Sequence, residues 1–329
     1  MTKISIIIPM YNVEKYIKKC VYSTFKQYLK ESEFEIIAID DESPDNSLKL
    51  ISTLAQKHSN IFVVSQKNRG LGGARNTGIK HAKGDYLLFL DADDFYIENT
   101  LKKIINVSNE NNLDILEFGA QGIDNNGNIA YQVEFKNEQN ILSGITYYNT
   151  SKSMNSACNK LYNRNYIIEN KLFFTEKIYG EDFEFNTRAL YLAKRVMAVN
   201  LVVAKFLQTE DSITRSNDII KKRKYINDLI TILRRTHKFR LKVENNKKQG
   251  HDLFFDKRMT LINIDIFFQM FKYKFPFSEI LKTKHLLKKE NIFYVHNTVE
   301  DYKRNLFRIV FLNFDFFFFR VALSLKKII

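Results

Sequence analysis

Three carboxylates crowd into four consecutive positions of this 329-residue chain, at Asp91, Asp93 and Asp94. They directly follow residues 86–90, a continuous apolar run that is typical of a strand buried on both faces. Ligands of open α/β sheets bind at the carboxyl ends of the strands. Carboxylates this close repel one another unless a hard cation accepts their oxygens, so the spacing indicates Mg²⁺ or Mn²⁺ holding a phosphate. The alternative is a plain turn and helix cap, because Asp is common in both.

The elements that would position these acids alternate along the first 120 residues. Strand patterns fall at residues 4–8, 34–39, 61–64 and 86–90, and helical spacing falls at residues 16–27, 47–55 and 73–82. Such alternation implies right-handed crossovers and a mainly parallel sheet flanked by helices, which is the α/β architecture of a Rossmann-like nucleotide-binding domain.

Other polar groups follow the earlier strands at the same expected edge. Pro9 and Tyr11 end the first strand and bring an aromatic ring to the mouth of the site. Asp40 and Asp41 end the second strand, where a carboxylate could accept hydrogen bonds from a base or a ribose hydroxyl. Neighbouring residues on a strand point in opposite directions, so only one of this pair can face a ligand.

A glycine-rich segment, residues 68–76, follows the third strand. Its glycines permit close backbone approach, and Arg75 could meet a phosphate or a carboxylate. Together with the acids these groups describe a nucleotide-diphosphate pocket without a P-loop. The structural alternatives are that Tyr11 is ordinary packing, and that Arg75 forms an ion pair with Asp85 or Glu98.

Five segments in order resemble the family 2 glycosyltransferases of the GT-A fold, over residues 3–215. They are SIIIPMYNVEKYI, IIAIDDESPDNS, NRGLGGARNTGI, GDYLLFLDADD and YGEDFEF. The resemblance implies that Pro9, Tyr11 and Asp41 line the nucleoside pocket, with Asp40 beside them. It also implies that Arg75 and Asn76 help to fix the sugar and the loop that carries it. Asp91 would contact the ribose or a metal-bound water, with Ala92 in the same motif, and Asp93 would coordinate Mn²⁺ or Mg²⁺. Asp182 would be the catalytic base.

The activity that the resemblance implies is inverting, metal-dependent transfer of a hexosyl or N-acetylhexosaminyl group. The donor would be a nucleotide-diphosphate sugar, most simply a UDP-sugar, and the acceptor a hydroxyl of a bacterial surface glycan, such as capsule or O-antigen, or of its lipid-linked precursor. Such a displacement needs a base for the hydroxyl proton and a cation for the leaving diphosphate. The structural alternative for Asp182 is that Glu181 and Asp182 only begin a helix.

Two other function classes share some of these features. A nucleotidyltransferase would carry a glycine-rich signature and a lysine after its first strand, where this chain has Pro9 to Asn12. A non-catalytic nucleotide-sugar or membrane-binding module would not need the metal acids together with Asp182.

Charge divides the chain in two. From residue 215 onward it has 26 Lys and Arg against 11 Asp and Glu, whereas residues 1–214 have 25 against 26. We therefore expect a catalytic domain at residues 1–215 and a basic, mostly helical region at residues 216–329 that contacts an anionic partner such as a membrane surface, or else the acceptor or another copy of the chain. No nucleic-acid-binding motif is present, so an anionic membrane surface is favoured.

A helix at residues 306–325 would place Arg304, Arg308, Asp315 and Lys326 on one stripe among Phe and Leu residues, which suits a helix packed partly into a domain, or one lying in a lipid headgroup layer, better than it suits a span. The alternative is that these charges are a solvated surface and the phenylalanines are core. No run is long and apolar enough to span a bilayer, no signal peptide is indicated, and Cys20 and Cys158 form no metal or disulfide pattern. These features predict a cytoplasmic protein that is peripheral on the inner face of the membrane.

Overall fold

The computed structural model forms two compact units, residues 1–210 and residues 211–329. It describes residues 2–135, 140–208, 218–299, 301–313, 316, 318 and 321–322. The predicted boundary at residue 215 and the segment 209–217 lie outside the described residues.

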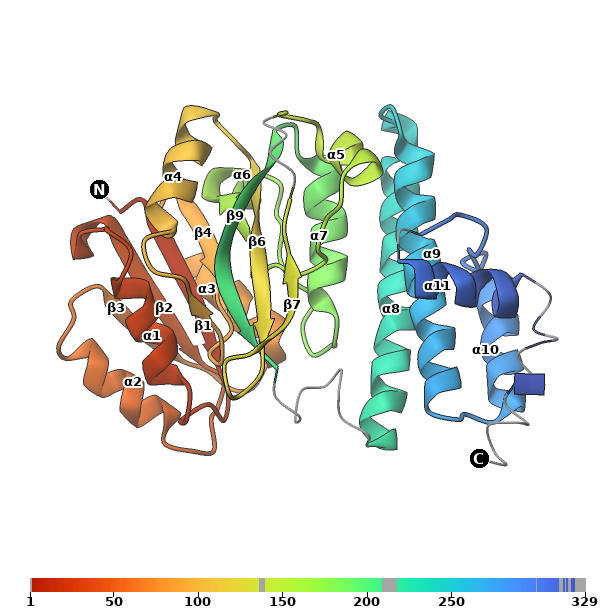
Figure 1. The fold of residues 1–329 in the computed structure, drawn as a ribbon, viewed down its shortest axis with the longest axis horizontal. Helices are drawn as coiled ribbons and strands as arrows, with labels where there is room; N and C mark the ends of the chain where they lie inside the picture. Colours follow the sequence, from red (N-terminus) through yellow and green to blue (C-terminus); the bar gives the residue numbers. More distant parts are fainter. Residues whose placement is uncertain are drawn as a thin grey trace. The chain divides into compact units, whose positions relative to one another are not determined.

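The first unit is built on one sheet, which Figure 1 shows with helices along it. Its parallel half has the strand order β3-β2-β1-β4. These strands are β1 (Ile4–Met10), β2 (Phe34–Asp40), β3 (Ile61–Ser65) and β4 (Tyr86–Phe89). Every residue of β1, β2 and β4 is buried, as their continuous apolar character predicts. The α/β fold with a mainly parallel sheet is therefore confirmed.

The other half of the sheet mixes strand directions. It continues from β4 in the order β8-β6-β9-β5, with β7 beside β6. These strands are β5 (Phe95–Tyr96), β6 (Ile115–Ile123), β7 (Ile129–Val133), β8 (Lys160–Asn163) and β9 (Val196–Leu207). β8 runs antiparallel to both β4 and β6, whereas β9 runs parallel to β6. Sequence patterns did not indicate β8, because it is four residues long and begins with a lysine.

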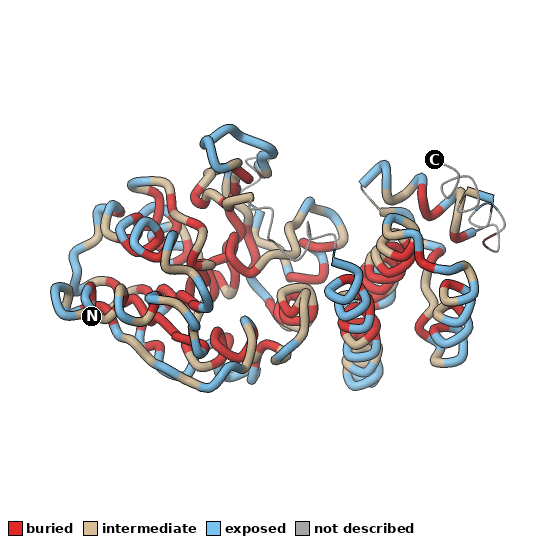
Figure 2. Tube along the Cα trace, turned by 90° about the horizontal axis from the view of Figure 1, so that it is seen from below, coloured by how far each residue is buried: buried red, intermediate tan, exposed pale blue. Residues whose placement is uncertain are grey.

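The helices of the first unit follow the strands that precede them in the chain. They are α1 (Ile17–Phe25), α2 (Ser47–Ala55), α3 (Gly70–His81), α4 (Leu101–Glu110), α5 (Gly144–Thr150), α6 (Arg164–Glu169) and α7 (Glu181–Leu192). Figure 2 shows the buried residues of this unit gathered in its interior and the exposed residues along its outer turns. The core is thus formed between the sheet and the apolar faces of these helices.

Glycines allow α3 to lie against a distant segment of the chain. α3 begins at Gly70, whose φ of 72° suits a residue without a side chain. A Cβ on Gly72 would lie 2.4 Å from the carbonyl oxygen of Thr175. The predicted close backbone approach is therefore made to the protein's own chain, near residues 174–177.

We expect the substitution G72A to destabilise the first unit. Replacing glycine by alanine inside a helix normally stabilises by about 1 kcal/mol, but the added methyl group here meets the Thr175 carbonyl oxygen. Overpacking of this kind costs roughly 1–3 kcal/mol, and urea unfolding would measure it. A G72A variant as stable as the wild type would show that α3 and the segment near Thr175 separate freely.

The second unit is helical in its described part. Its helices are α8 (Ile219–Val243), α9 (His251–Lys272), α10 (Phe277–Lys289) and α11 (Tyr302–Phe307), and a short helical turn follows at Arg308–Leu312. Phe254, Phe255 and Phe267 are fully buried, so these phenylalanines form the core of the unit. None of the helices within the described ranges is long and apolar enough to cross a membrane.

Of the two expectations for residues 306–325, a stripe facing lipid headgroups is wrong at Arg308, where the structure instead agrees with packing into the domain. Its side chain is buried, and its Nη1 donates to the carbonyl oxygens of Val295 at 2.9 Å and His296 at 3.1 Å. The guanidinium thus satisfies backbone carbonyls inside the unit. Asp315, Arg320 and Lys326 lie outside the described residues.

Candidate active site

The ends of three parallel strands bring the predicted site residues to one edge of the sheet. Met10 at the end of β1 pairs with Asp40 at the end of β2, and Phe89 at the end of β4 pairs with Ile7 of β1. The residues that follow these strands, Tyr11, Asp41 and Asp91, therefore emerge side by side.

Asp41 is fixed by the segment that follows β3. Its Oδ1 accepts hydrogen bonds from Nε2 of Gln66 at 2.6 Å and from the backbone N–H of Arg69 at 2.9 Å. Among the described residues no donor binds its Oδ2, which is left to accept a bond from a ligand. Asp40 instead accepts from the backbone N–H of Ser43 at 3.3 Å, inside its own turn.

The two residues from β1 differ in access. Pro9 is buried within the strand, whereas Tyr11 is 53% exposed just beyond its end. An exposed ring at this edge is better suited to stacking on a base than to packing in the core.

Arg75 lies at the centre of the site and is fully buried. Its Nη2 donates to Oδ1 of Asp91 at 2.8 Å, and its Nη1 donates to Oε1 of Glu181 at 2.8 Å and to Oδ1 of Asp182. The ring of Phe174 lies 5.2 Å from its guanidinium carbon, within cation–π range. Arg75 therefore joins the acid after β4 to the acids of α7, and neither Asp85 nor Glu98 is its partner.

Asp182 lies in the first turn of α7, at the positive end of the helix dipole. Its Oδ2 accepts a hydrogen bond from the backbone N–H of Ala157 at 2.9 Å. Its side chain is 20% exposed, whereas that of Glu181 is 7% exposed. An acceptor hydroxyl can therefore reach Asp182 more readily than Glu181.

Burial changes the proton affinity of both α7 acids. Burial raises the pKa of Asp182 above its ordinary value, and the charge of Asp91 adds to that rise, while Arg75 opposes it. Burial and the charge of Asp182 raise the pKa of Glu181 to about 7. A raised pKa makes a carboxylate a better proton acceptor near neutral pH.

The raised pKa of Glu181 predicts a pH dependence of stability. An acid whose pKa is higher in the folded state stabilises the fold fully below its unfolded value, 4.5, and loses that contribution as pH rises through about 7. We expect the free energy of unfolding to fall by about 3 kcal/mol over this window from Glu181 alone. Urea unfolding of wild type and E181Q across pH 4.5 to 8 would measure it. Parallel curves for the two proteins would contradict the assignment.

The acids after β4 fit a divalent cation shared with a phosphate. Asp94 is buried and accepts from the backbone N–H of Leu207 at 2.8 Å, so it ties the turn to β9 instead of capping the next helix. Asp91 gives one oxygen to Arg75 and keeps its side chain 34% exposed, and Asp93 is partly exposed. Proteins hold Mg²⁺ with one or two carboxylates plus substrate phosphates, and this pair of acids matches that donor set. No cluster of three or more acidic, His or Cys side chains is arranged for a metal within the described part of the chain.

Asn76 braces the site from behind. Its Nδ2 donates to the carbonyl oxygen of Phe174 at 2.9 Å, and its Oδ1 accepts from the backbone N–H of the same residue at 2.7 Å. The nitrogen and the oxygen of the side-chain amide are both hydrogen-bonded, so Asn76 holds the segment that carries the Phe174 ring against Arg75. Ala92 is buried between the two half-buried acids of its turn, Asp91 and Asp93.

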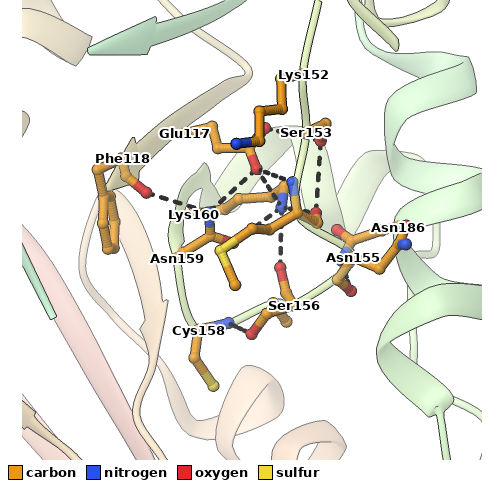
Figure 3. A network of polar contacts seen from close by, with 12 residues as sticks. Glu117, Phe118, Lys152, Ser153, Asn155, Ser156, Cys158, Asn159, Lys160 and Asn186 are labelled. Atoms are coloured by element: carbon orange, nitrogen blue, oxygen red, sulfur yellow. Dashed lines mark hydrogen bonds and ion pairs between the residues drawn. The ribbon is translucent and has the colours of Figure 1, made fainter. Parts of the chain in front are cut away.

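A buried ion pair beside the site gave no signal in the sequence. Glu117 of β6 and Lys160 of β8 are both fully buried, with Oε1 and Nζ 3.0 Å apart. Figure 3 shows their bonds converging on the loop at residues 152–159, which carries the Ala157 N–H. Glu181, by contrast, adjoins Asp182 in the sequence, so its place in the site could have been recognised from the sequence.

The sheet, with acids and a buried arginine at its edge, has a fold of the GT-A type. The structure resembles that of Staphylococcus aureus TarS 1–349 in complex with UDP-GlcNAc, with a TM-score of 0.64 and 24% identity over 83% of this chain and 73% of that chain. A model of the family described as glycosyl transferase family 2 matches residues 5–170. The chain belongs to glycosyl transferase family 2.

Two curated relatives carry the same likeness. The uncharacterized glycosyltransferase EpsJ of Bacillus subtilis is 32% identical over 217 residues, which are 64% of this chain and 62% of that protein. The poly(ribitol-phosphate) beta-glucosyltransferase of Bacillus spizizenii is 34% identical over 197 residues, which are 59% of this chain and 30% of that protein. The match thus spans less than two thirds of either relative.

Proposed function

We propose that this protein is an inverting, metal-dependent glycosyltransferase that moves a sugar from a nucleotide-diphosphate donor to a hydroxyl of a glycan acceptor. The observation that carries the proposal is the pairing of Arg75 with both Asp91 and Asp182, which places a candidate base next to the candidate cation site. Family membership supports it and argues against a nucleotidyltransferase.

Asp182 is the group that takes the acceptor's proton. Arg75 and the Ala157 N–H each occupy one of its oxygens, but each carboxylate oxygen has a second lone pair. These two bonds fix the carboxylate, while its raised pKa gives it affinity for the proton. The acceptor oxygen then attacks the anomeric carbon as the bond to the diphosphate breaks, which inverts the configuration there.

Asp93, with Asp91 beside it, would hold Mn²⁺ or Mg²⁺. The bound cation would neutralise the departing diphosphate. Asp41 and Tyr11 bind the nucleoside at the other end of the donor, through the Oδ2 atom of Asp41 and the exposed ring of Tyr11. The donor we favour is a UDP-sugar, because TarS binds UDP-GlcNAc.

The acceptor we favour is a bacterial surface polymer or its lipid-linked precursor. Relatives of the chain include glycosyltransferases of poly(ribitol-phosphate). Such a role would bring the protein to the cytoplasmic face of the membrane as a peripheral enzyme.

A thermal screen of UDP-, GDP- and dTDP-sugars with and without Mn²⁺ tests the donor and the cation together. A ligand at about 100 times its Kd stabilises the folded protein by about 2.7 kcal/mol, which is a shift of several degrees. We expect one nucleotide class to raise the Tm, and to do so only with metal. No response from any donor would overturn the proposal.

We also propose that the outer face of α10 contacts an anionic membrane. The acids at its two ends are engaged by α8, since Glu279 pairs with Arg223 and Glu290 pairs with Arg234, each at 2.7 Å. The outer face has exposed Leu281 and Leu286. It borders a hollow of about 590 Å³ lined by Ser278, Leu281, Lys282, His285, Leu286 and Lys289. Leucines among cations suit a surface that offers both anionic headgroups and acyl chains.

We expect the full chain to bind phosphatidylglycerol vesicles but not phosphatidylcholine vesicles. Each lysine near an anionic leaflet contributes about 1 kcal/mol, so reversing two of them in K282E/K289E should weaken binding at least roughly 30-fold. Co-sedimentation would measure this. The control K49E/K57E makes the same charge change on exposed lysines of the first unit. Equal loss in both variants would show general charge attraction and contradict a role for α10.

A further inference from the structure

We propose that the buried ion pair of Glu117 and Lys160 is a positioning device for the carboxylate of Asp182, acting through the backbone of the loop at residues 152–159. The inference rests on the proposed function, because it assigns Asp182 as the base. Neither Glu117 nor Lys160 would touch substrate, so both are positioning residues.

The ion pair is saturated with bonds to that loop. Oε1 of Glu117 accepts from the backbone N–H of Met154 at 2.7 Å, and its Oε2 accepts from the hydroxyl of Ser153 at 2.8 Å. Nζ of Lys160 donates to the carbonyl oxygens of Met154 at 2.6 Å and Ser156 at 2.9 Å. Glu117 therefore binds donors of the loop and Lys160 binds its carbonyl acceptors, as Figure 3 shows.

Three further hydrogen bonds fix the ion pair and the loop. Nδ2 of Asn159 donates to Oε1 of Glu117 at 3.0 Å, and Oη of Tyr147 donates to Oε2 at 2.8 Å. Nδ2 of Asn186 on α7 donates to the carbonyl oxygen of Asn155 at 3.0 Å. The loop is thus held between β6, β8, α5 and α7.

The loop delivers two groups to the active site. The backbone N–H of Ala157 binds Oδ2 of Asp182, and Sγ of Cys158 accepts from Nη2 of Arg75 at 3.6 Å. Ala157 lies one residue after Ser156, whose carbonyl oxygen Lys160 holds. A shift of the ion pair therefore moves the donor that orients the base.

Burying a full charge pair is costly, and apolar residues of similar volume often stabilise a core better. The charges of Glu117 and Lys160 therefore have a role besides stability, because their hydrogen bonds hold the loop in one conformation. That conformation fixes the position of the Ala157 N–H that binds Asp182.

The bond from Ala157 also affects the proton affinity of Asp182. That N–H, Arg75 and the charge of Lys160 lower the pKa of Asp182, whereas burial and Asp91 raise it. The charged or titratable groups that face Asp182 are Arg75 of α3, Glu181 of α7, Asp91 after β4, Cys158 of the loop, and Lys160 and Tyr162 of β8. Loss of the Ala157 bond should raise the pKa of the base.

The test is the pH profile of transfer by E117Q. Gln keeps the shape of the side chain but removes the charge that pairs with Lys160. We expect kcat to fall on the order of 10- to 100-fold with the KM for the donor unchanged, because misplacement acts on the reacting geometry. We expect the acidic limb of kcat/KM to move to higher pH by roughly half a unit to one unit. If E117Q alone unfolds, the uncharged double variant E117Q/K160M replaces it. Its kcat and the hydrogen exchange of the Ala157 amide are then the readouts, because loss of the Lys160 charge raises the pKa of Asp182 by itself.

The matched control is E35Q. Glu35 is also a buried acid that holds backbone, since it accepts from the N–H groups of Lys83 at 2.6 Å and Gly84 at 3.3 Å, but it lies near the amino end of β2. We expect E35Q to leave the pH profile unchanged. A folded E117Q with the wild-type profile, or an equal shift in E35Q, would overturn the inference.

Hydrogen exchange of the Ala157 amide separates this inference from the proposed function. We expect faster exchange in E117Q than in E35Q or wild type. An inactive wild type would overturn the proposed function, and the exchange rate would still decide whether the ion pair holds the loop. Unchanged exchange in E117Q would overturn the inference by itself.

Discussion

The variant D182N should bind the donor as the wild type does and transfer almost no sugar. Asn keeps the size of the side chain and can still accept one of the two bonds from Arg75 and Ala157, but it cannot take a proton from the acceptor hydroxyl. Loss of a general base lowers the rate by about 10² to 10⁴, and this loss should appear in kcat. Steady-state kinetics with calorimetric measurement of donor binding would show the separation.

The control for D182N is E181Q, which changes the neighbouring acid bound to the same arginine. Glu181 has the pKa nearest neutrality, about 7, but its side chain is only 7% exposed. A base must first be within reach of the acceptor hydroxyl, whatever its pKa, and Glu181 is the less accessible of the two acids. We therefore expect E181Q to retain far more activity than D182N. An active D182N with an inactive E181Q would reassign the base to Glu181.

The variant R75M should be the most destabilising single change in the site. Arg75 is fully buried and is the shared cation of Asp91, Glu181 and Asp182. Removing it leaves buried carboxylates without their counter-charge, which costs about 3–5 kcal/mol. Urea unfolding at pH 8, where the acids must ionise, would measure the loss, and transfer should be lost as well.

The control for R75M is R69M, near the start of the same helix. Arg69 pairs with Glu176 by a two-pronged ion pair, but the two side chains are 39% and 35% exposed. Exposed pairs contribute about 0–1 kcal/mol, so R69M should cost little. Equal losses of stability in R75M and R69M would mean that burial of the ion pairs does not determine how much Arg75 stabilises the fold.

The layout of the sheet edge could be predicted because it follows from chain order. Continuous apolar runs gave the strands, and parallel strands put the residues after β1, β2 and β4 at one edge. The acid pair of α7 was found from its resemblance to a family motif, and its roles stay predictions.

The contacts inside the site could not be predicted, because they join residues far apart in the chain. Arg75 pairs with acids 106 and 107 residues later, whereas Asp85 and Glu98, the acids considered, lie closer in sequence. The glycines around Gly72 predicted a close backbone approach but not which group approaches, and in the structure that group is the carbonyl oxygen of Thr175.

Buried charges escaped the sequence patterns for a related reason. Lys160 was an unremarkable cation in a basic chain, and Arg308 was placed on a stripe that could face lipid headgroups, because nothing local distinguishes a buried cation from a solvated one. Lys160 can be buried because Glu117 pairs with it across adjacent strands, and Arg308 because backbone carbonyl oxygens accept hydrogen bonds from its guanidinium.

Diffraction from crystals grown with UDP and Mn²⁺ tests the central claim most directly. The anomalous signal of manganese would locate the cation without assumptions about the ligand. We predict a peak bonded to Asp93 and to the diphosphate, the uracil against Asp41, and Asp182 facing the space where the sugar would lie. A manganese peak away from Asp93, or UDP bound outside the edge formed by β1, β2 and β4, would contradict the account.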